Sequence, residues 1–208
     1  MVSLQLKGCK YCNQLPPLGQ LPQLKELRII KFDGLVTLGS EFYGSGTSYV
    51  TKSFPTLEIL SCDSLKFLPL DHFPSLKSLD VWGCKNLEAL TVSESDVTTT
   101  TLNSLQFLCV RHCPNFMSFP KGGFAAPKLT LLTINYCDKL NSLPEKMHHL
   151  MPNLKELQLQ GCPKIESSTM TTLKIKICNK LNEGKQNHSD PLFARLEGLA
   201  SAQSPSSS

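Results

Sequence analysis

The sequence has few aromatic residues, little excess charge and no long apolar run. Aromatic residues make up 7% of the chain, with a single tryptophan. The formal net charge of +4 over 208 residues does not indicate a basic nucleic-acid surface. No apolar run approaches the length of about 20 residues that crosses a bilayer, and the N-terminus MVSLQLKGCK lacks the regions of a secretory signal. We therefore expect a cytoplasmic protein that binds neither nucleic acid nor membrane.

Sequence patterns of catalytic, cofactor and metal sites are also missing. The five histidines form no H-E-x-x-H set, and the chain has neither G-x-S-x-G nor the phosphate-binding G-x-x-x-x-G-K-[ST]. Cys9-x-x-Cys12 has no second pair or histidines beside it, which makes it a weak zinc pattern. Nine cysteines is an odd number without paired spacings, so a disulfide framework is not expected either. We predict no enzyme activity, no cofactor and no metal.

Leucine, by contrast, is abundant and recurs with a fixed spacing. The 35 leucines follow the pattern L-x-x-L-x-L-x-x-C-x-x-L, which is clear over 76–87, 105–116, 129–140 and 154–165. Earlier copies fit at 24–35 and, with Met1 in the first position, at 1–9. Two further copies fit less well. One, at 57–65, uses Leu57, Leu60, Cys62 and Leu65, and its cysteine is displaced from the usual position. The other, at 170–181, begins too few residues after the preceding copy. Such spacings indicate leucine-rich repeats.

The pattern predicts a leucine-rich-repeat solenoid. Residues two apart in each L-x-L segment point to the same side of a short strand, so the leucines fill a shared core. Successive strands then form a curved parallel β-sheet on the concave face, and irregular loops with short 3-10 or α turns form the convex face. The repeated cysteine follows each strand and is expected in the core.

The repeats define the domain organisation. About eight irregular repeats form one solenoid over 1–181, with surface loops around 44–48 and 93–101. A polar linker is expected at 182–189, a short capping helix at 190–200 and a disordered tail at 201–208.

Two segments give the sequence a specific family resemblance. CKYCNQLPPLGQLPQLKELRI, from Cys9 to Ile29, and LGSEFYGSG, from Leu38, resemble the plant disease-resistance receptors of the coiled-coil nucleotide-binding leucine-rich-repeat type. The likeness covers roughly 1–181 and concerns only their C-terminal repeats. It implies an intracellular receptor region that senses pathogen effectors or restrains activation. Because the chain starts inside a repeat, we expect a fragment or truncated product.

The resemblance also implies partners and a cofactor. The partner would be a pathogen effector, a guarded host protein or the receptor's own nucleotide-binding domain. ADP or ATP is expected only in an upstream domain that this sequence does not contain.

The residues between the inward leucines predict where a partner would bind. They face the concave surface, and apolar side chains among them concentrate in the middle repeats. The candidate protein-binding residues are Ile59, Asp63, Asp80, Trp82, Phe107, Arg111, Leu131 and Asn135. A different interpretation is that these side chains merely cover the sheet or lie beneath a loop.

Two other functional classes share parts of this pattern. Ubiquitin-ligase substrate adaptors also carry cysteine at this position, but their repeats are more even and have true convex helices. Extracellular repeat inhibitors would need asparagine in the cysteine position and a signal peptide, and only the sequon Asn187-His188-Ser189 agrees with them.

Overall fold

The structure is a computed structural model that describes residues 2–18, 21–38, 54–92, 102–165 and 172–176. The expected loops around 44–48 and 93–101, the linker, the capping helix and the tail lie outside these described residues.

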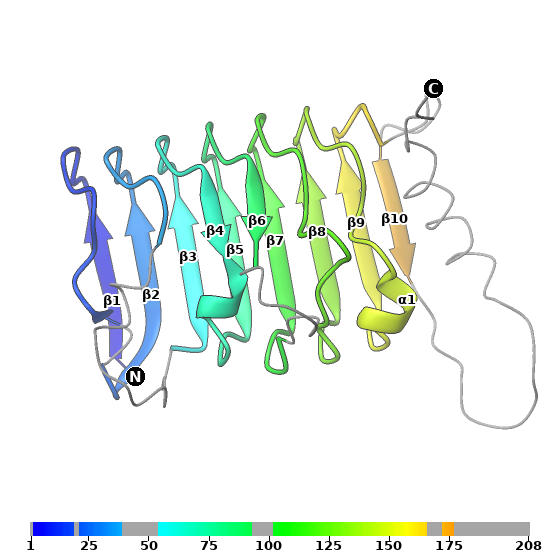
Figure 1. The fold of residues 1–208 in the computed structure, drawn as a ribbon, viewed down its shortest axis with the longest axis horizontal. Coiled ribbons are helices and arrows are strands. Elements are labelled where there is room, and N and C mark those ends of the chain that lie inside the picture. Colours follow the sequence, from blue (N-terminus) through cyan, green and yellow to red (C-terminus); the bar gives the residue numbers. More distant parts are fainter. Residues whose placement is uncertain (1, 19–20, 39–53, 93–101, 166–171, 177–208) are drawn as a thin grey trace, which may run out of the picture.

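One sheet of eight strands runs the length of the described chain (Figure 1). Its order is β1 (Val2–Lys7), β2 (Leu24–Ile30), β3 (Thr56–Leu60), β5 (Ser78–Trp82), β7 (Phe107–Arg111), β8 (Leu131–Asn135), β9 (Glu156–Gln160) and β10 (Thr172–Lys176). The first seven strands pair in parallel, each with the next repeat along the sequence. The predicted leucine-rich-repeat solenoid is confirmed.

The alternation of side chains along each strand explains the core. In β5, Leu79 and Val81 are fully buried, whereas Ser78, Asp80 and Trp82 keep some exposure on the other side. The strands pair in register, so the buried leucines form a continuous row across the sheet: Leu27, Leu57, Leu79, Leu108, Leu132 and Leu157. Each repeat therefore buries its apolar side chains against its two neighbours.

The third repeat is not aligned as we predicted. The prediction put Leu60 level with Leu79, but Leu57 pairs with Leu79 and Ile59 pairs with Val81. Leu57 and Ile59, both 0% exposed, therefore fill the two strand positions of the core. Phe54, which is 1% exposed, takes the first leucine position. With Phe54 in place the repeat has the regular spacing, and Cys62 keeps the usual cysteine position. A search for leucine missed it because phenylalanine fills the same apolar position.

The last repeat also departs from the expected parallel arrangement. β10 pairs with β9 in antiparallel orientation, with Thr172 opposite Gln160 and Lys176 opposite Glu156. The regular solenoid therefore comprises seven parallel strands, and an antiparallel strand follows the seventh. The prediction of an eighth equivalent repeat is wrong for this strand, while Cys178 and Leu181 lie outside the described residues.

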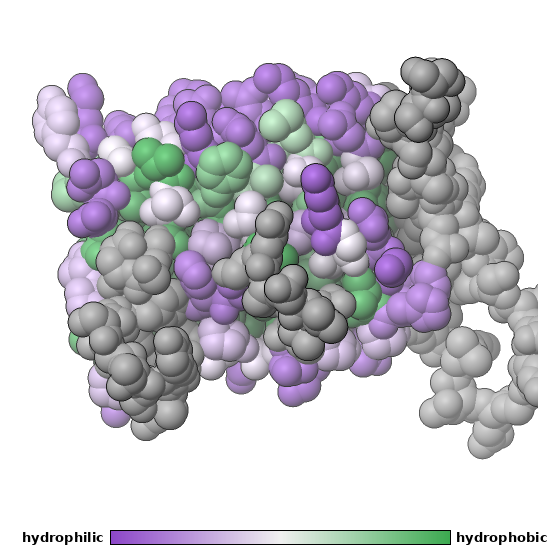
Figure 2. Space-filling view, viewed as in Figure 1, coloured by the Kyte–Doolittle hydropathy of each residue, from purple (hydrophilic) through white to green (hydrophobic). Residues whose placement is uncertain are grey.

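The convex side contains short turns, as predicted, and a small second sheet, which was not. A 3-10 helix, η3, spans Leu70–His72, and one turn of α-helix, α1, spans Met147–Leu150. β4 (Phe67–Pro69) pairs in parallel with β6 (Ala89–Thr91). Figure 2 shows hydrophobic surface below a hydrophilic rim along the upper strand ends. Phe67 on β4 is an exposed apolar residue of this side, as are Val36 and Met117 in neighbouring connections.

The repeated cysteines form a row inside the solenoid, as predicted. Cys62, Cys84, Cys113, Cys137 and Cys162 are all 0% exposed. Their thiols lie near carbonyl oxygens of the preceding strand: the Cys62 Sγ is 3.7 Å from Ile29 O, and the Cys137 Sγ is 3.8 Å from Val110 O. These contacts suit a weak S–H donor.

The first repeat carries a disulfide that we did not predict. Cys9 and Cys12 are bonded to each other, with their Cα atoms 5.5 Å apart. Cys9 holds the cysteine position of the repeat, and Cys12 holds the leucine position three residues later.

Candidate protein-binding site

We call the outward positions of β2, β3, β5, β7, β8 and β9 the concave face. Each strand contributes three such side chains, and the strand register arranges them in three rows. Six of the eight predicted residues come together on three adjacent strands: Asp80, Trp82, Phe107, Arg111, Leu131 and Asn135. One row places Phe107 beside Leu131, and another places Trp82, Arg111 and Asn135 side by side.

Two aromatic side chains stand out in this cluster because they remain exposed. Trp82 is 42% exposed and Phe107 is 41% exposed, although both belong to strands whose alternate residues are fully buried. Leu131, opposite Phe107 in the next strand, is half-buried. The concave face therefore carries apolar side chains in two rows of β5, β7 and β8, with Phe107 and Leu131 in one row and Trp82 in another.

A polar network lies between and beside these apolar side chains. Arg111 Nη2 donates to Asp80 Oδ2 at 2.5 Å, and both side chains are partly exposed. The pair contributes about 0–1 kcal/mol to stability at such exposure. Within the described residues Arg111 Nε, Asp80 Oδ1 and Asn135 Oδ1 are buried and have no hydrogen-bond partner. A small rearrangement of these groups would let a bound partner complete their hydrogen bonding.

The middle row of the cluster offers no reactive thiol. Cys109 is half-buried between Asp80 and Thr133 in the strand register. Burial, with a contribution from the nearby Asp80 carboxylate, raises the pKa of the Cys109 thiol. A raised pKa keeps the sulfur protonated at neutral pH, and a protonated thiol is a poor nucleophile.

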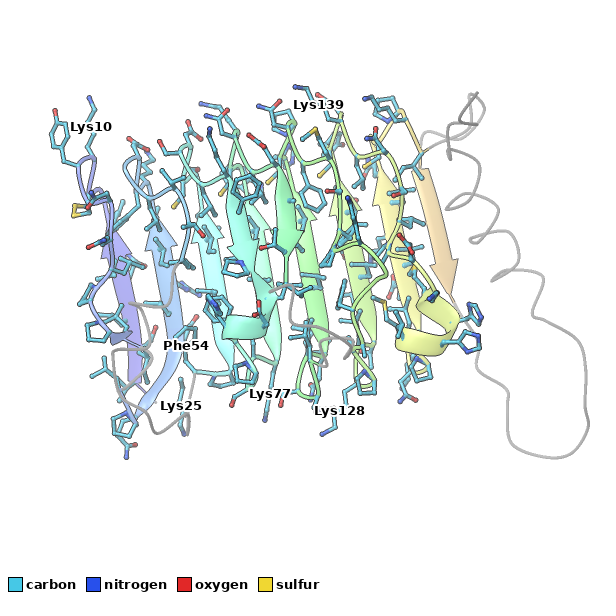
Figure 3. All side chains as sticks on the ribbon, viewed as in Figure 1. Lys10, Lys25, Phe54, Lys77, Lys128 and Lys139 are labelled. Carbon is cyan, nitrogen blue, oxygen red and sulfur yellow. A yellow bond between two sulfur atoms is a disulfide. The ribbon has the colours of Figure 1, made fainter. Side chains whose placement is uncertain are left out.

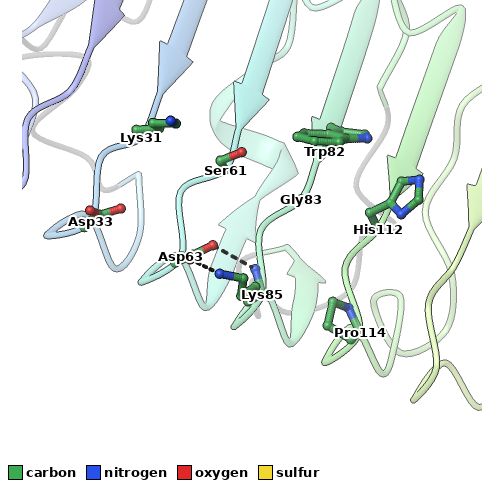
Figure 4. Close-up of a pocket in the computed structure, with 9 residues that line it drawn as sticks. All are labelled: Lys31, Asp33, Ser61, Asp63, Trp82, Gly83, Lys85, His112 and Pro114. Atoms are coloured by element: carbon green, nitrogen blue, oxygen red, sulfur yellow. Dashed lines mark hydrogen bonds and ion pairs between the residues drawn. The ribbon is translucent and has the colours of Figure 1, made fainter.

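Ile59 and Asp63 do not belong to the concave face. Ile59 lies in the core because of the corrected alignment of the third repeat. Asp63 lies beyond the end of β3, where its carboxylate forms an ion pair with Lys85 Nζ at 2.8 Å. Asp63 and Lys85 line a hollow of about 660 Å³ at the edge of the sheet, together with Trp82, Gly83 and His112 (Figure 4).

Sequence reasoning missed an aromatic cluster at this edge. The His112 ring stacks on the Tyr136 ring with centroids 4.6 Å apart, and Trp82 meets His112 edge-on at 5.7 Å. Gln160 Nε2 also donates to the Tyr136 hydroxyl at 3.0 Å. His112 and Tyr136 occupy the same position in successive repeats, directly before the cysteine, and that shared position was the available signal.

A second missed group lies on β2 and β3. Arg28 is between two carboxylates, with Nη2 at 2.9 Å from Glu26 Oε1 and Nε at 3.0 Å from Glu58 Oε2. Arg28 and Glu58 are paired residues in the sheet register, so their contact follows from the fold. The incorrect alignment of the third repeat had hidden Glu58 as a concave residue.

The described part of the chain offers no group of three or more His, Cys, Asp or Glu residues that could hold a metal ion. Among the same residues, no helix has the length and apolar character needed to span a membrane.

Comparison with known proteins finds relatives of one kind. The chain is 31% identical over 199 residues to the disease resistance RPP13-like protein 1 of Arabidopsis thaliana, which covers 80% of this chain and 19% of that protein. A second Arabidopsis thaliana disease resistance protein is 35% identical over 186 residues, covering 81% of this chain and 11% of the relative. Disease resistance protein RGA2 of Solanum bulbocastanum is 28% identical, with coverages of 78% and 14%. The chain thus spans at most about a fifth of these relatives. No family model and no solved structure matches it.

Proposed function

Because the chain is related over about 80% of its length to plant disease-resistance proteins, we propose that it is the protein-recognition region of an intracellular plant immune receptor. It binds a pathogen effector, a guarded host protein or the receptor's own nucleotide-binding domain, and in this way senses infection or restrains activation. The region acts in the cytoplasm by shape and side-chain complementarity, without catalysis and without binding nucleic acid or membrane. ADP or ATP belongs to an upstream domain of the receptor.

The observation that carries this proposal is the exposure of Trp82 and Phe107 on the concave face. Tryptophan and arginine are enriched among the residues that dominate binding energy at protein interfaces. Here Trp82 lies beside Arg111 in the same row, and Phe107 precedes Arg111 on the same strand. Exposed apolar side chains interspersed with polar groups are common on protein-binding surfaces.

The convex side argues against the alternative of a ubiquitin-ligase substrate adaptor, whose repeats carry true convex helices. In the described ranges, the helical segments are short: η3 has three residues and α1 has four, and a further 3-10 turn includes Leu18. The relatives named above are all disease resistance proteins, which supports the receptor proposal further.

Replacing the two exposed aromatic residues together tests the proposal. A two-hybrid screen of pathogen effectors and host proteins against the wild-type chain would identify partners. The double variant Trp82→Ala/Phe107→Ala should then lose binding by about 100-fold or more, while its circular-dichroism spectrum stays unchanged. Val36→Ala/Phe67→Ala is the matched control, since these convex residues are 46% and 39% exposed. Equal binding by wild type and the Trp82/Phe107 variant would contradict the proposal.

A further inference from the structure

The turn that follows each strand is closed in the same way in six of the seven parallel repeats. The backbone N–H three residues after the cysteine position donates to the carbonyl oxygen of that position, over 3.0–3.4 Å. The acceptor and donor residues are Phe32 and Leu35, Cys62 and Leu65, Cys84 and Leu87, Cys113 and Phe116, Cys137 and Leu140, and Cys162 and Ile165. All of these side chains are buried. A hydrogen bond and core packing therefore hold each of these six turns.

The first repeat closes the same turn with a disulfide. Cys9 and Cys12 occupy the two positions, and within the described residues no backbone hydrogen bond joins them. Their side chains are only partly buried, because β1 is at the end of the sheet and pairs with β2 alone. The covalent bond thus does what a hydrogen bond and packing do in the other repeats.

The closed turn contacts the second repeat at two points. Directly before the turn, Gly8 N–H donates to Ile30 O at 2.9 Å, which extends the pairing of β1 with β2. At its other end, Cys12 O lies so close to Gly34 that a Cβ on Gly34 would be 2.9 Å away. Opening of the turn would loosen both contacts, and with them the end of β1.

Solvent reaches this disulfide but not the repeated cysteines of the core. The residues on both sides of each bonded cysteine are exposed: Gly8, Lys10, Tyr11 and Asn13. Figure 3 shows Lys10 at the β1 end of the solenoid, with its side chain directed away from the sheet. The core cysteines are 0% exposed, and burial raises the pKa of the Cys109 thiol. Thiol–disulfide exchange needs access and a thiolate, so among the described cysteines we expect it at Cys9 and Cys12.

We infer that Cys9 and Cys12 form a reversible redox modification site, whose state determines how firmly β1 is attached to the solenoid. In reduction, the thiolate of one glutathione attacks a sulfur of the disulfide and forms a mixed disulfide, from which a second glutathione releases the cysteine. The bond between Cys9 and Cys12 is broken, one glutathione disulfide forms, and the two thiol protons of glutathione pass to the cysteines. Glutathione disulfide reverses the reaction and takes up the two electrons. Disulfides of cytoplasmic proteins are mostly of this transient kind.

Equilibration with glutathione tests the chemistry. The chain is incubated at several ratios of reduced to oxidised glutathione, free thiols are trapped with iodoacetamide, and mass spectrometry of peptides reports the state of each cysteine. The oxidised fraction of the pair should follow the ratio as a two-electron couple, with the same curve from either starting state. Cys9→Ser should instead leave Cys12 carrying one glutathione. Cys109→Ser is the matched control and should leave the curve unchanged.

Hydrogen exchange of the reduced and oxidised chain tests the effect on β1. Amides of β1 and of the turn should exchange about tenfold faster after reduction, because the short loop is no longer closed, while amides of β7 should exchange equally in both states. Cys9→Ser/Cys12→Ser should exchange like the reduced wild type and be insensitive to glutathione.

Three results would overturn the inference: thiols at Cys9 and Cys12 at every glutathione ratio, a bond that reduced glutathione does not open, or equal exchange of β1 in both states. None of these measurements involves the binding of a partner to Trp82 and Phe107, so their failure would leave the proposed function standing.

Discussion

At the scale of the residue, each parallel repeat has one residue in a left-handed backbone conformation directly before the cysteine position, which Phe32 fills in the second repeat. The φ values are +54° at Lys31, +53° at Ser61, +54° at His112 and +55° at Tyr136. Gly8, Gly83 and Gly161 take the same position in the other repeats. A left-handed conformation costs a residue with a side chain about 1–2 kcal/mol, and glycine avoids that cost. The fold thus requires a positive φ at this position even in the repeats where the residue is not glycine.

Ser61→Gly should therefore stabilise the protein. The relief of backbone strain exceeds the entropy that glycine adds to the unfolded chain, so we expect a gain of about 0.5–1 kcal/mol. Urea unfolding followed by circular dichroism measures it. Ser64→Gly is the control, because the φ of Ser64 is not positive and glycine should destabilise there. If both variants lose stability equally, the backbone explanation is wrong.

Gly161 carries a second constraint, because Tyr136 covers it. A Cβ at Gly161 would lie 2.6 Å from Tyr136 Cδ1, whereas a Cβ at Gly8 would meet nothing within 4 Å. We expect Gly161→Ala to cost about 1 kcal/mol more than Gly8→Ala. The extra cost should disappear in a Tyr136→Ala background, as measured by a double-mutant cycle of unfolding free energies. A coupling free energy of zero would show that the Tyr136 ring moves away from the new Cβ at no cost in stability.

Residue by residue, the sequence predicts the core better than the surface. Leu79, Leu108, Leu132 and Leu157 were expected inside, and each is fully buried because strand alternation leaves one choice. The stacking of His112 on Tyr136 was not predicted. The left-handed position before the cysteine holds lysine, serine, histidine, tyrosine or glycine in the different repeats. The residue type at this position therefore does not reveal the left-handed turn that aligns the two rings.

At the scale of the element, the cysteines connect repeats that are distant in sequence. Hydrogen bonds with the Cys113 and Cys62 thiols, and then burial, raise the pKa of the Cys84 thiol. A hydrogen bond with the Cys162 thiol, and then burial, raises the pKa of Cys137 in the same way. The hydrogen bonds to Cys84 lower the pKa values of its partners Cys62 and Cys113.

Stability should consequently decrease at alkaline pH. Above the ordinary thiol pKa of about 8.5, the unfolded chain releases a proton that folded Cys137 retains. The hydrogen bonds that raise the pKa of Cys84 lower the pKa values of Cys62 and Cys113, so those three thiols offset one another. Cys137 then removes about 1.4 kcal/mol of stability per pH unit, and has no such effect at neutral pH. In urea unfolding at several pH values between neutrality and about 10, Cys137→Ala should show a shallower decline than wild type. Val110→Ala, which removes packing but no titrating group, should keep the wild-type slope; a wild-type slope for Cys137→Ala as well would contradict the argument.

The sequence predicted the wrong alignment for two strands, β3 and β10, and the two errors have different physical causes. For β3 the repeat spacing was right, but only leucine was considered for the first position, which Phe54 occupies. For β10 the sequence spacing resembles a repeat, but the strand runs antiparallel to β9. Strand direction depends on the path of the preceding connection, and an L-x-I pattern reads the same in either direction.

At the scale of the whole molecule, a solenoid is stabilised only through contacts between neighbouring repeats. β7 has a parallel partner on each side, whereas β1 pairs with β2 alone. The burial of side chains follows the same trend: Leu108 on β7 is 0% exposed, and Leu4 on β1 is only half-buried. Stability should therefore be highest in the central strands and lowest at β1.

Hydrogen exchange and truncation of leucines test this gradient together. Amide protons of β7 and β8 should exchange most slowly and those of β1 fastest, because opening a central repeat breaks two interfaces and opening the first breaks one. Leu108→Ala should cost about 2–5 kcal/mol and speed exchange in β5 and β8 as well as β7. Leu4→Ala should cost less and affect only β1 and β2. Uniform exchange across the sheet would instead indicate that the repeats unfold as one cooperative unit, and the neighbour-limited description of this solenoid would be wrong.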